Sequence, residues 1–204
     1  MRIISTVCPV ALAVIISAGC ATSGNSDTPT AAPPKPAGPP VIAISVPPAK
    51  TLSGDGQPFA GPDPCLELGD DVIERLGFDP LSRARNEETP SAHVFVGCSF
   101  EGRELASPPS PSQSSVVTGF LYVSASSMTL GEIRDGIKNA SDTEVGGLEA
   151  VEYVYGDDKI CDVVIERPYG TLSVRRSVVR SSSRQEACAG IDEIAEEVSY
   201  RLPE

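Results

Sequence analysis

The chain has 204 residues and a formal net charge of −12, from 28 acidic and 16 basic side chains. Such an excess of carboxylates disfavours electrostatic binding to phosphate backbones, so we expect no nucleic-acid partner. The length is enough for one domain of ordinary size in addition to terminal segments.

The N-terminal residues 1–19 have the plan of an export signal. Arg2 is followed by an apolar run that ends in the small residues Ser17, Ala18 and Gly19. A basic start, a short apolar run and a small-residue cleavage site are typical of a signal peptide. The run contains Pro9 and is shorter than the about 20 apolar residues of a membrane-spanning helix. We therefore predict that residues 1–19 are removed after export.

The segment around Cys20 resembles a bacterial lipobox. The resemblance implies that the Cys20 thiol is alkylated by a diacylglyceryl group and that cleavage leaves this residue at the new N-terminus. Further acylation, for example with palmitate, would give a stable anchor, because each buried methylene contributes about 0.8 kcal/mol. We expect a lipoprotein held at the extracellular face of the bacterial cell membrane, with the membrane as its partner through the lipid anchor.

Residues 20–61 are rich in proline, with dense tracts over 28–40 and 46–48. Such segments are extended and semi-rigid, because the pyrrolidine ring fixes the backbone and removes a hydrogen-bond donor. The composition predicts a disordered spacer between lipid and domain. Two alternatives stay open, namely that the tract is a ligand for an aromatic-lined groove and that the apolar stretch 41–46 adds an edge strand.

Residues 62–204 form the predicted domain, and their cysteines indicate disulfide bonds. Cys8 leaves with the signal, so the domain retains four cysteines, Cys65, Cys98, Cys161 and Cys188. An even number in an exported domain indicates two disulfides, for which three pairings are possible. We expect no metal and no cofactor, because the chain has no clustered cysteine pair and its one histidine is His93.

The secondary-structure signals predict an α+β domain. The apolar spacing of Leu68, Val72, Ile73 and Leu76 is typical of an amphipathic helix, and Thr129 with Glu132 forms a capping-box motif. The predicted elements are, in chain order, a helix over 63–77, strands over 93–100 and 116–125, a helix over 129–137, strands over 148–155, 160–167 and 171–179, and a helix over 187–202. This order predicts a meandering antiparallel sheet with about three packed helices.

The predicted elements narrow the disulfide pairing. Each half of the domain has one cysteine at the start of a helix and one cysteine on a strand. We therefore predict the pairs Cys65–Cys98 and Cys161–Cys188. Each would close a loop of about 30 residues and stabilise the fold by about 3–4 kcal/mol in the chain-entropy model.

Several of these features together resemble a known family. They are the lipobox, the proline-rich spacer, the sequence Asp63-Pro-Cys65, the sequence Gly97-Cys98-Ser99-Phe100 and a last helix that opens near Cys188. They resemble the small actinobacterial secreted lipoproteins of the domain-of-unknown-function 3558 type, over most of residues 62–204. The resemblance implies an exported, disulfide-bonded lipoprotein and supplies no reaction. Only as a fold-level analogy, its sheet resembles the PsbP and Mog1 type, whose members mostly serve as binding and assembly modules.

The sequence carries no recognisable catalytic motif. It has no G-x-S-x-G elbow, no P-loop and no dinucleotide fingerprint, and we interpret His93 as a strand-edge residue. We therefore expect no enzyme. The alternative is a hydrolase of cell-wall material that draws its acid or base from Glu101, Glu152 or Glu166. Asp157, Asp158 and Asp162 lack the twelve-residue pattern of a calcium loop.

Two groups of residues are candidates for recognition. Positive charge is concentrated on and after the last predicted strand, at Arg175, Arg176, Arg180 and Arg184. Such a group suits a phosphate, a carboxylate or an acidic partner. Tyr153 and Tyr155 share one side of their strand and are candidates to line a lipid or glycan groove. The function that we favour is a binding or assembly module that engages an envelope protein or an envelope lipid.

Overall fold

The computed structural model of the chain describes residues 38–50, 58–88, 93–110, 113–180 and 183–204. The predicted signal, the predicted lipidation site Cys20 and the linker up to residue 37 lie outside the described residues. Within the described ranges, no helix is long and apolar enough to cross a membrane.

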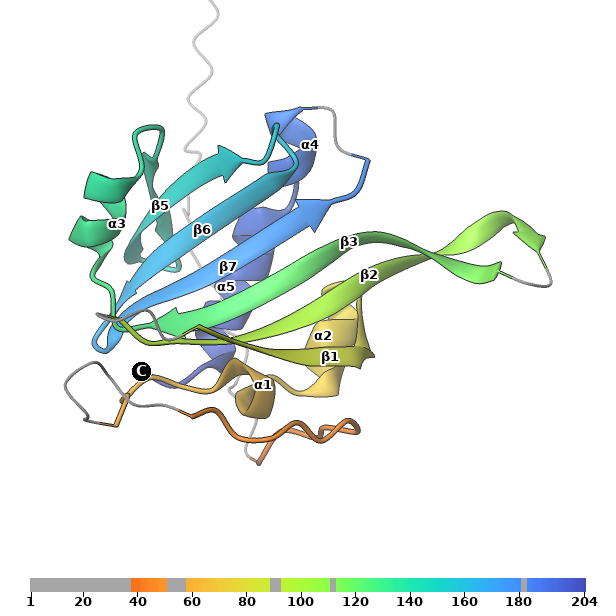
Figure 1. Cartoon of the computed structure of the whole chain (residues 1–204), viewed down its shortest axis with the longest axis horizontal. Helices are drawn as coiled ribbons and strands as arrows, with labels where there is room; N and C mark the ends of the chain where they lie inside the picture. Colours follow the sequence, from red (N-terminus) through yellow and green to blue (C-terminus); the bar gives the residue numbers. More distant parts are fainter. Residues whose placement is uncertain (1–37, 51–57, 89–92, 111–112, 181–182) are drawn as a thin grey trace, which may run out of the picture. The chain divides into compact units, whose positions relative to one another are not determined.

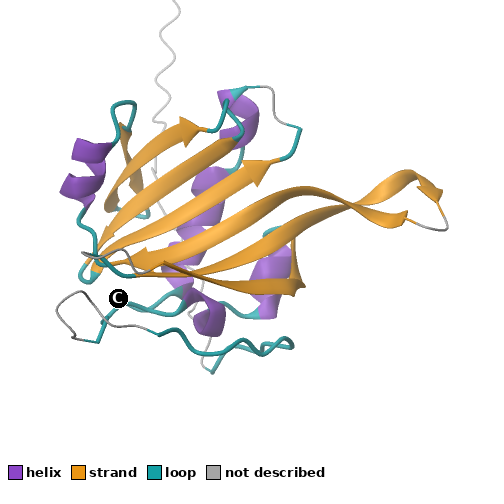
Figure 2. Ribbon diagram, in the orientation of Figure 1, coloured by secondary structure: helices purple, strands orange, loops and turns teal. Residues whose placement is uncertain are grey.

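The described chain is built on one antiparallel sheet of seven strands (Figures 1 and 2). The strands are β1 (Phe78–Glu88), β2 (Phe95–Ser110), β3 (Gln113–Ser126), β4 (Ser141–Val145), β5 (Leu148–Tyr155), β6 (Ile160–Arg167) and β7 (Gly170–Val178). Their spatial order is β1-β2-β3-β7-β6-β5-β4. Two meanders, β1 to β3 and β4 to β7, are therefore joined side by side where β3 pairs with β7.

The expected meandering antiparallel sheet is confirmed, but two of its strands were not expected. Both of these strands, β1 and β4, are at the edges of the sheet. An edge strand has one pairing neighbour and needs less apolar alternation than a central strand. In β4 only Val145 is buried, and β1 contains Pro80 together with charged residues. The alternation of apolar and polar residues is therefore weak in both segments.

The described chain also contains more helices than the three that were expected. They are α1 (Pro64–Glu67), α2 (Asp70–Arg75), α3 (Leu130–Gly136), α4 (Arg184–Cys188) and α5 (Ile191–Arg201). The predicted helix over 129–137 is present as α3, with the capping box between Thr129 and Glu132. The predicted helices over 63–77 and 187–202 are each divided into two.

An arginine from the sheet binds the backbone carbonyls exposed at each division. Near the end of α1, Arg83 donates from Nη1 to the carbonyl of Cys65 at 3.1 Å and from Nη2 to that of Leu68 at 2.9 Å. Before α5, Gly190 adopts a φ of 72°, and Arg176 donates to the carbonyls of Glu186, Ala187 and Ala189. These contacts supply partners for carbonyl groups that a continuous helix would have bonded internally.

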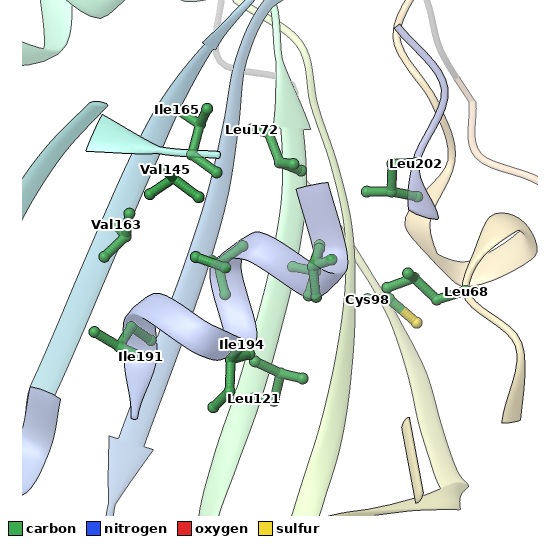
Figure 3. Packing of buried hydrophobic residues seen from close by; sticks show 14 of the residues in the cluster. Leu68, Cys98, Leu121, Val145, Val163, Ile165, Leu172, Ile191, Ile194 and Leu202 are labelled. Atoms are coloured by element: carbon green, nitrogen blue, oxygen red, sulfur yellow. The ribbon is translucent and has the colours of Figure 1, made fainter. Parts of the chain in front are cut away.

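The main hydrophobic core lies between one face of the sheet and four helices, α1, α2, α4 and α5 (Figure 3). Its largest members include Leu68, Ile73, Phe100, Leu121, Ile165, Leu172 and Ile191, all almost fully buried. Both expected disulfides, Cys65–Cys98 and Cys161–Cys188, are present and join a helix to a strand through this core. Each half of the chain is thus tied covalently across the layer between helices and sheet.

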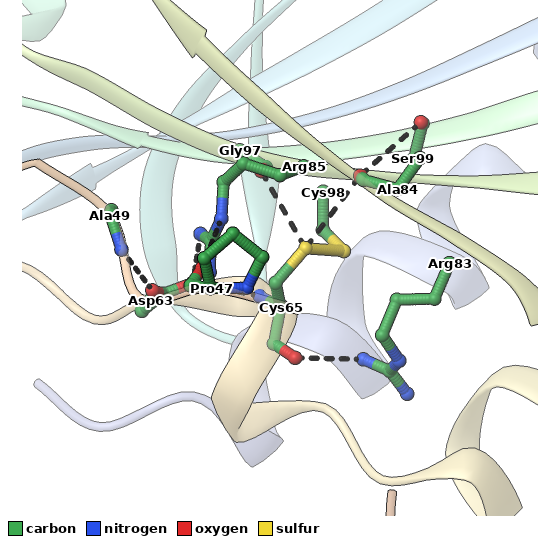
Figure 4. Close-up of polar contacts among 10 residues, drawn as sticks. All are labelled: Pro47, Ala49, Asp63, Cys65, Arg83, Ala84, Arg85, Gly97, Cys98 and Ser99. Atoms are coloured by element: carbon green, nitrogen blue, oxygen red, sulfur yellow. Dashed lines mark hydrogen bonds and ion pairs between the residues drawn. A yellow bond between two sulfur atoms is a disulfide. The ribbon is translucent and has the colours of Figure 1, made fainter. Parts of the chain in front are cut away.

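Residues 38–50 lie against the domain, which corrects the expected disordered linker over this stretch. The Ala43 amide donates to Asp70 Oδ2 at 2.7 Å. Figure 4 shows a second contact, in which Arg85 Nη2 donates to the Pro47 carbonyl at 2.9 Å. The alternative that the stretch 41–46 adds an edge strand is wrong, because this segment pairs with no strand. We call residues 38–50 the docked segment.

The other face of the sheet is covered only at one end. Helix α3 packs there through Leu130, which forms a small buried cluster together with Val151 of β5 and Val164 of β6. The helices α1, α2, α4 and α5 all belong to the opposite face. We call the remaining surface, on the strands beyond α3, the open face.

Candidate binding site

A row of four side chains crosses the open face. Tyr122 of β3 is paired with Arg175 of β7, Arg175 with Asp162 of β6, and Asp162 with Tyr153 of β5. Side chains alternate between the two faces along each strand. Three of the neighbours that follow them in sequence, Val123, Val154 and Val163, are core residues, and Arg176 points to the helices, so the four polar side chains project to the opposite side.

Asp162 is the centre of this row and is 0% exposed. Its Oδ1 accepts from Ser173 Oγ at 2.6 Å, and its Oδ2 accepts from Tyr153 Oη at 3.0 Å and from Arg175 Nε at 2.9 Å. A buried carboxylate is stable only with such partners, because its desolvation is costly. The three donors are therefore held in fixed positions around one anion.

Arg175 is held by Asp162 and remains accessible, with 41% of its side chain exposed. Its guanidinium carbon lies 5.2 Å from the centroid of the Tyr155 ring, within reach of a cation–π interaction. Burial lowers the pKa of Arg175, but the charge and hydrogen bond of Asp162 together with the neighbouring Tyr155 and Tyr153 outweigh this effect, so the pKa is raised overall. Arg175 is thus a permanent cation whose orientation is fixed on two sides.

The two predicted tyrosines lie beside this cation. The rings of Tyr153 and Tyr155 stack with centroids 5.7 Å apart and an interplanar angle of 27°. Burial and the negative charge of Asp162 raise the pKa of both phenols, which stay protonated at neutral pH. The Tyr155 hydroxyl is buried and has no hydrogen-bond partner among the described residues.

A hollow lies directly beside Arg175, where the next row of the open face consists of the small residues Gly97, Ser124 and Ser173. A Cβ atom at position 97 would lie 3.2 Å from the Ser124 Cβ, so glycine allows the close approach of β2 and β3. This row is the floor of a cavity of about 170 Å³. The walls of the cavity are larger side chains, with Phe95 on one side and Tyr122 and Arg175 on the other. We call this cavity and its cation the Arg175 site.

Only one of the four predicted arginines belongs to this site. Arg176 points to the helix face, where it binds the carbonyls before α5. Arg184 forms an ion pair with Glu152 at 2.8 Å, and Arg180 is exposed in the turn after β7. The four side chains therefore do not form a single basic patch.

The carboxylates considered for hydrolysis are not gathered at the hollow. Glu101 is paired with Arg103 at 2.5 Å, Glu152 is paired with Arg184, and Glu166 is exposed on β6. None of the three lines the Arg175 site.

One group of possible metal ligands lies elsewhere among the described residues. A carboxylate oxygen of Glu152 and the sulfur atoms of Cys161 and Cys188 lie within 4.8 Å of one another. The two sulfur atoms are bonded to each other in a disulfide, so they supply no thiolate for a metal. Asp162, which the sequence offers as a possible calcium ligand, uses both carboxylate oxygens to accept hydrogen bonds from Ser173 and Arg175.

Several residues of the site were not identified from the sequence. Asp162 was considered only for a calcium loop, and Tyr122, Ser124 and Phe95 were not singled out. A partial signal exists in the alternation of β3 and β6, which places Tyr122 and Asp162 opposite to the core residues. The pairing of β3 with β7, however, joins residues about fifty positions apart, as in Tyr122 with Arg175. Local patterns do not report such pairing.

Comparison with known proteins gives one family match. Residues 15–200 match the model of a family described as "Protein of unknown function (DUF3558)". No curated protein and no solved structure matches the chain. The matched span includes position 20 and all four disulfide-bonded cysteines.

Proposed function

The chain belongs to the DUF3558 family, and we propose that it is a lipid-anchored binding module of the bacterial cell envelope. In this proposal Cys20 carries the lipid, and the open face of the sheet carries the ligand site. The ligand is an envelope component that reaches the Arg175 site from solvent.

The observation that carries the binding role is the composition of the open face. A solvent-facing side of an antiparallel sheet usually bears polar residues without a common centre. Here a buried carboxylate fixes an accessible arginine that lies over the Tyr155 ring. The hollow beside this arginine is lined by the aromatic residues Phe95 and Tyr122. Ligand sites typically combine such apolar walls with a few precisely held polar groups. We favour binding over hydrolysis because Glu101, Glu152 and Glu166 lie away from this hollow.

Two features support the location in the envelope. The disulfides Cys65–Cys98 and Cys161–Cys188 are typical of proteins that fold in an oxidising compartment. The residues before Cys20 have the pattern of an export signal and a lipobox.

The anchor is tested by the substitution Cys20→Ser in cells that are fed an alkyne-labelled fatty acid. The unsubstituted chain is expected to incorporate the label and to sediment with membranes as a shortened form. The variant is expected to lose the label and to keep its signal segment. Equal labelling of both chains would exclude Cys20 as the lipidation site.

The binding role is tested by native mass spectrometry of the full-length protein after gentle extraction from its own membrane. We expect a bound mass beyond that of the acylated chain. Tyr122→Ala should reduce the bound fraction, whereas the matched substitution Tyr200→Ala on α5 should not. A protein without any adduct, or with the same adduct in all three forms, would argue against a ligand on the open face.

A further inference from the structure

We propose that the Arg175 site binds an organic oxyanion, meaning a carboxylate or a phosphate monoester attached to a small apolar group. This inference rests on the proposed function, because it names the ligand class of the same face. It follows from three properties of the site: the free donors of Arg175, their fixed orientation, and the size and walls of the hollow.

The donors come from the terminal nitrogens of Arg175. A guanidinium has five N–H donors, and the one on Nε is used by Asp162 at 2.9 Å. Among the described residues the side chain of Arg175 makes no further hydrogen bond, and 41% of it is exposed beside the hollow. The planar fork formed by the two terminal nitrogens matches the paired oxygens of a carboxylate or a phosphate.

The orientation of this fork is set before any ligand binds. Asp162 is fully buried and is itself fixed by Ser173 at 2.6 Å and by Tyr153 at 3.0 Å. On its other side the guanidinium lies over the Tyr155 ring. A preorganised arginine loses little side-chain freedom on binding, which favours recognition of a ligand with few contacts.

The hollow sets the size and character of the ligand. Its volume of about 170 Å³ is below the about 300–1,000 Å³ of pockets for drug-sized ligands. It therefore accepts a small acid or the acidic end of a larger molecule. Phe95 and Tyr122 offer apolar ring surface to the remainder of the ligand, while the floor of Gly97 and Ser124 leaves the space open.

The matched probes are butanoate, butyl phosphate and the uncharged butanamide. Binding is measured by saturation-transfer NMR on the full-length lipidated protein in nanodiscs, with empty nanodiscs as the blank. We expect butanoate or butyl phosphate to bind at least about tenfold more tightly than butanamide, since a hydrogen bond to a charged group is worth about that factor. The tighter of the two acids identifies the preferred oxyanion, and either preference supports the proposal.

Two variants separate the ligand site from the structural ion pair. Arg175→Gln should weaken acid binding to the level of butanamide. Ser124→Val fills the floor of the hollow while Arg175 and Asp162 keep their own side chains, and it should also abolish binding. Ser99→Val, on the open face but outside the hollow, is the matched control and should bind as the unsubstituted protein does. If Arg175→Gln does not fold, Ser124→Val decides alone.

The proposal is wrong if acids and amide bind equally, if no probe binds, or if Ser124→Val binds acids normally. None of these results removes an adduct found by native mass spectrometry. If native mass spectrometry finds a bound envelope component that Tyr122→Ala loses, the proposed binding role still holds. The site would then recognise a chemical group other than an oxyanion.

Discussion

Asp162 and Arg175 form an ion pair whose two members differ in exposure: the carboxylate is 0% exposed and the guanidinium 41% exposed, with 2.9 Å between Oδ2 and Nε. The anion depends on its partners because water does not reach it. The cation, in contrast, is able to exchange its contact with Asp162 for contacts with water. The two residues therefore differ in what their loss does to the fold.

We expect Arg175→Met to destabilise the protein by about 3 kcal/mol or more, because it leaves a buried carboxylate without its cation. Asp162→Asn should cost less, about 1–2 kcal/mol, because Arg175 stays partly solvated. Urea unfolding of the two variants measures the difference. The double variant should cost less than the sum of the single ones, since the residues interact directly. Additive effects, or a costlier Asp162→Asn, would contradict this view of the pair.

Three partly buried tyrosines, two of them on the open face, should lower the stability of the protein at alkaline pH. Burial and the charge of Asp162 raise the pKa of Tyr153 and Tyr155, and burial raises the pKa of Tyr169 to about 12. Above about pH 10 these residues ionise in the unfolded chain but not in the folded one, so stability falls as the pH rises.

Thermal unfolding between about pH 9 and about pH 11 tests this expectation. Tyr153→Phe should be less stable than the unsubstituted protein at neutral pH, because it loses the hydrogen bond to Asp162. Its stability should fall less steeply at alkaline pH, since one shifted phenol is absent. The same slope for both proteins would show that Tyr153 does not contribute to the alkaline transition.

Removing either disulfide should lower the stability of the protein by a similar amount. The bonds Cys65–Cys98 and Cys161–Cys188 span 33 and 27 residues. Loop-closure entropy then predicts a stabilisation of about 3.5 kcal/mol for each. Replacing either pair by alanines should lower the free energy of unfolding in urea by about this amount. A loss under about 1 kcal/mol would mean that the helices stay docked without the covalent link.

We expect Arg85 to hold the docked segment against the domain. Arg85 donates to the Pro47 carbonyl and pairs with Asp63, the N-cap residue of α1 (Figure 4). Arg85→Ala should increase hydrogen exchange over residues 43–49, while exchange in β5 to β7 stays unchanged. Arg134→Ala is the matched control, because Arg134 likewise holds two partners, Asp142 and Glu149, but lies on α3. Unchanged exchange over 43–49 would show that Asp70 and apolar contacts suffice to hold the segment.

Local sequence patterns were sufficient where the deciding interactions are local. The capping box of α3 involves Thr129 and Glu132, three positions apart, and was predicted correctly. Alternation placed Cys161 on the core face of β6, which led to the correct partner Cys188. The divisions of the two longer predicted helices were missed. They depend on Arg83 and Arg176, which come from distant strands and bind carbonyls that local spacing assigns to a continuous helix.

The sequence by itself determined the antiparallel α+β class, both disulfide pairs and the placement of Tyr153 and Tyr155 on one side of a strand. These properties follow from the two-residue period of strands, the apolar spacing of helices, and the number of cysteines together with their places on the predicted helices and strands. Only the tertiary structure decided which arginine stands beside those tyrosines. Arg175 and Arg176 are adjacent in the chain but point to opposite faces, and the pairing of β7 with β3 and β6 brings Arg175 alone to Asp162, Tyr122 and the hollow. The physical reason is that strand pairing is fixed by burial of the whole sheet, which no single segment encodes.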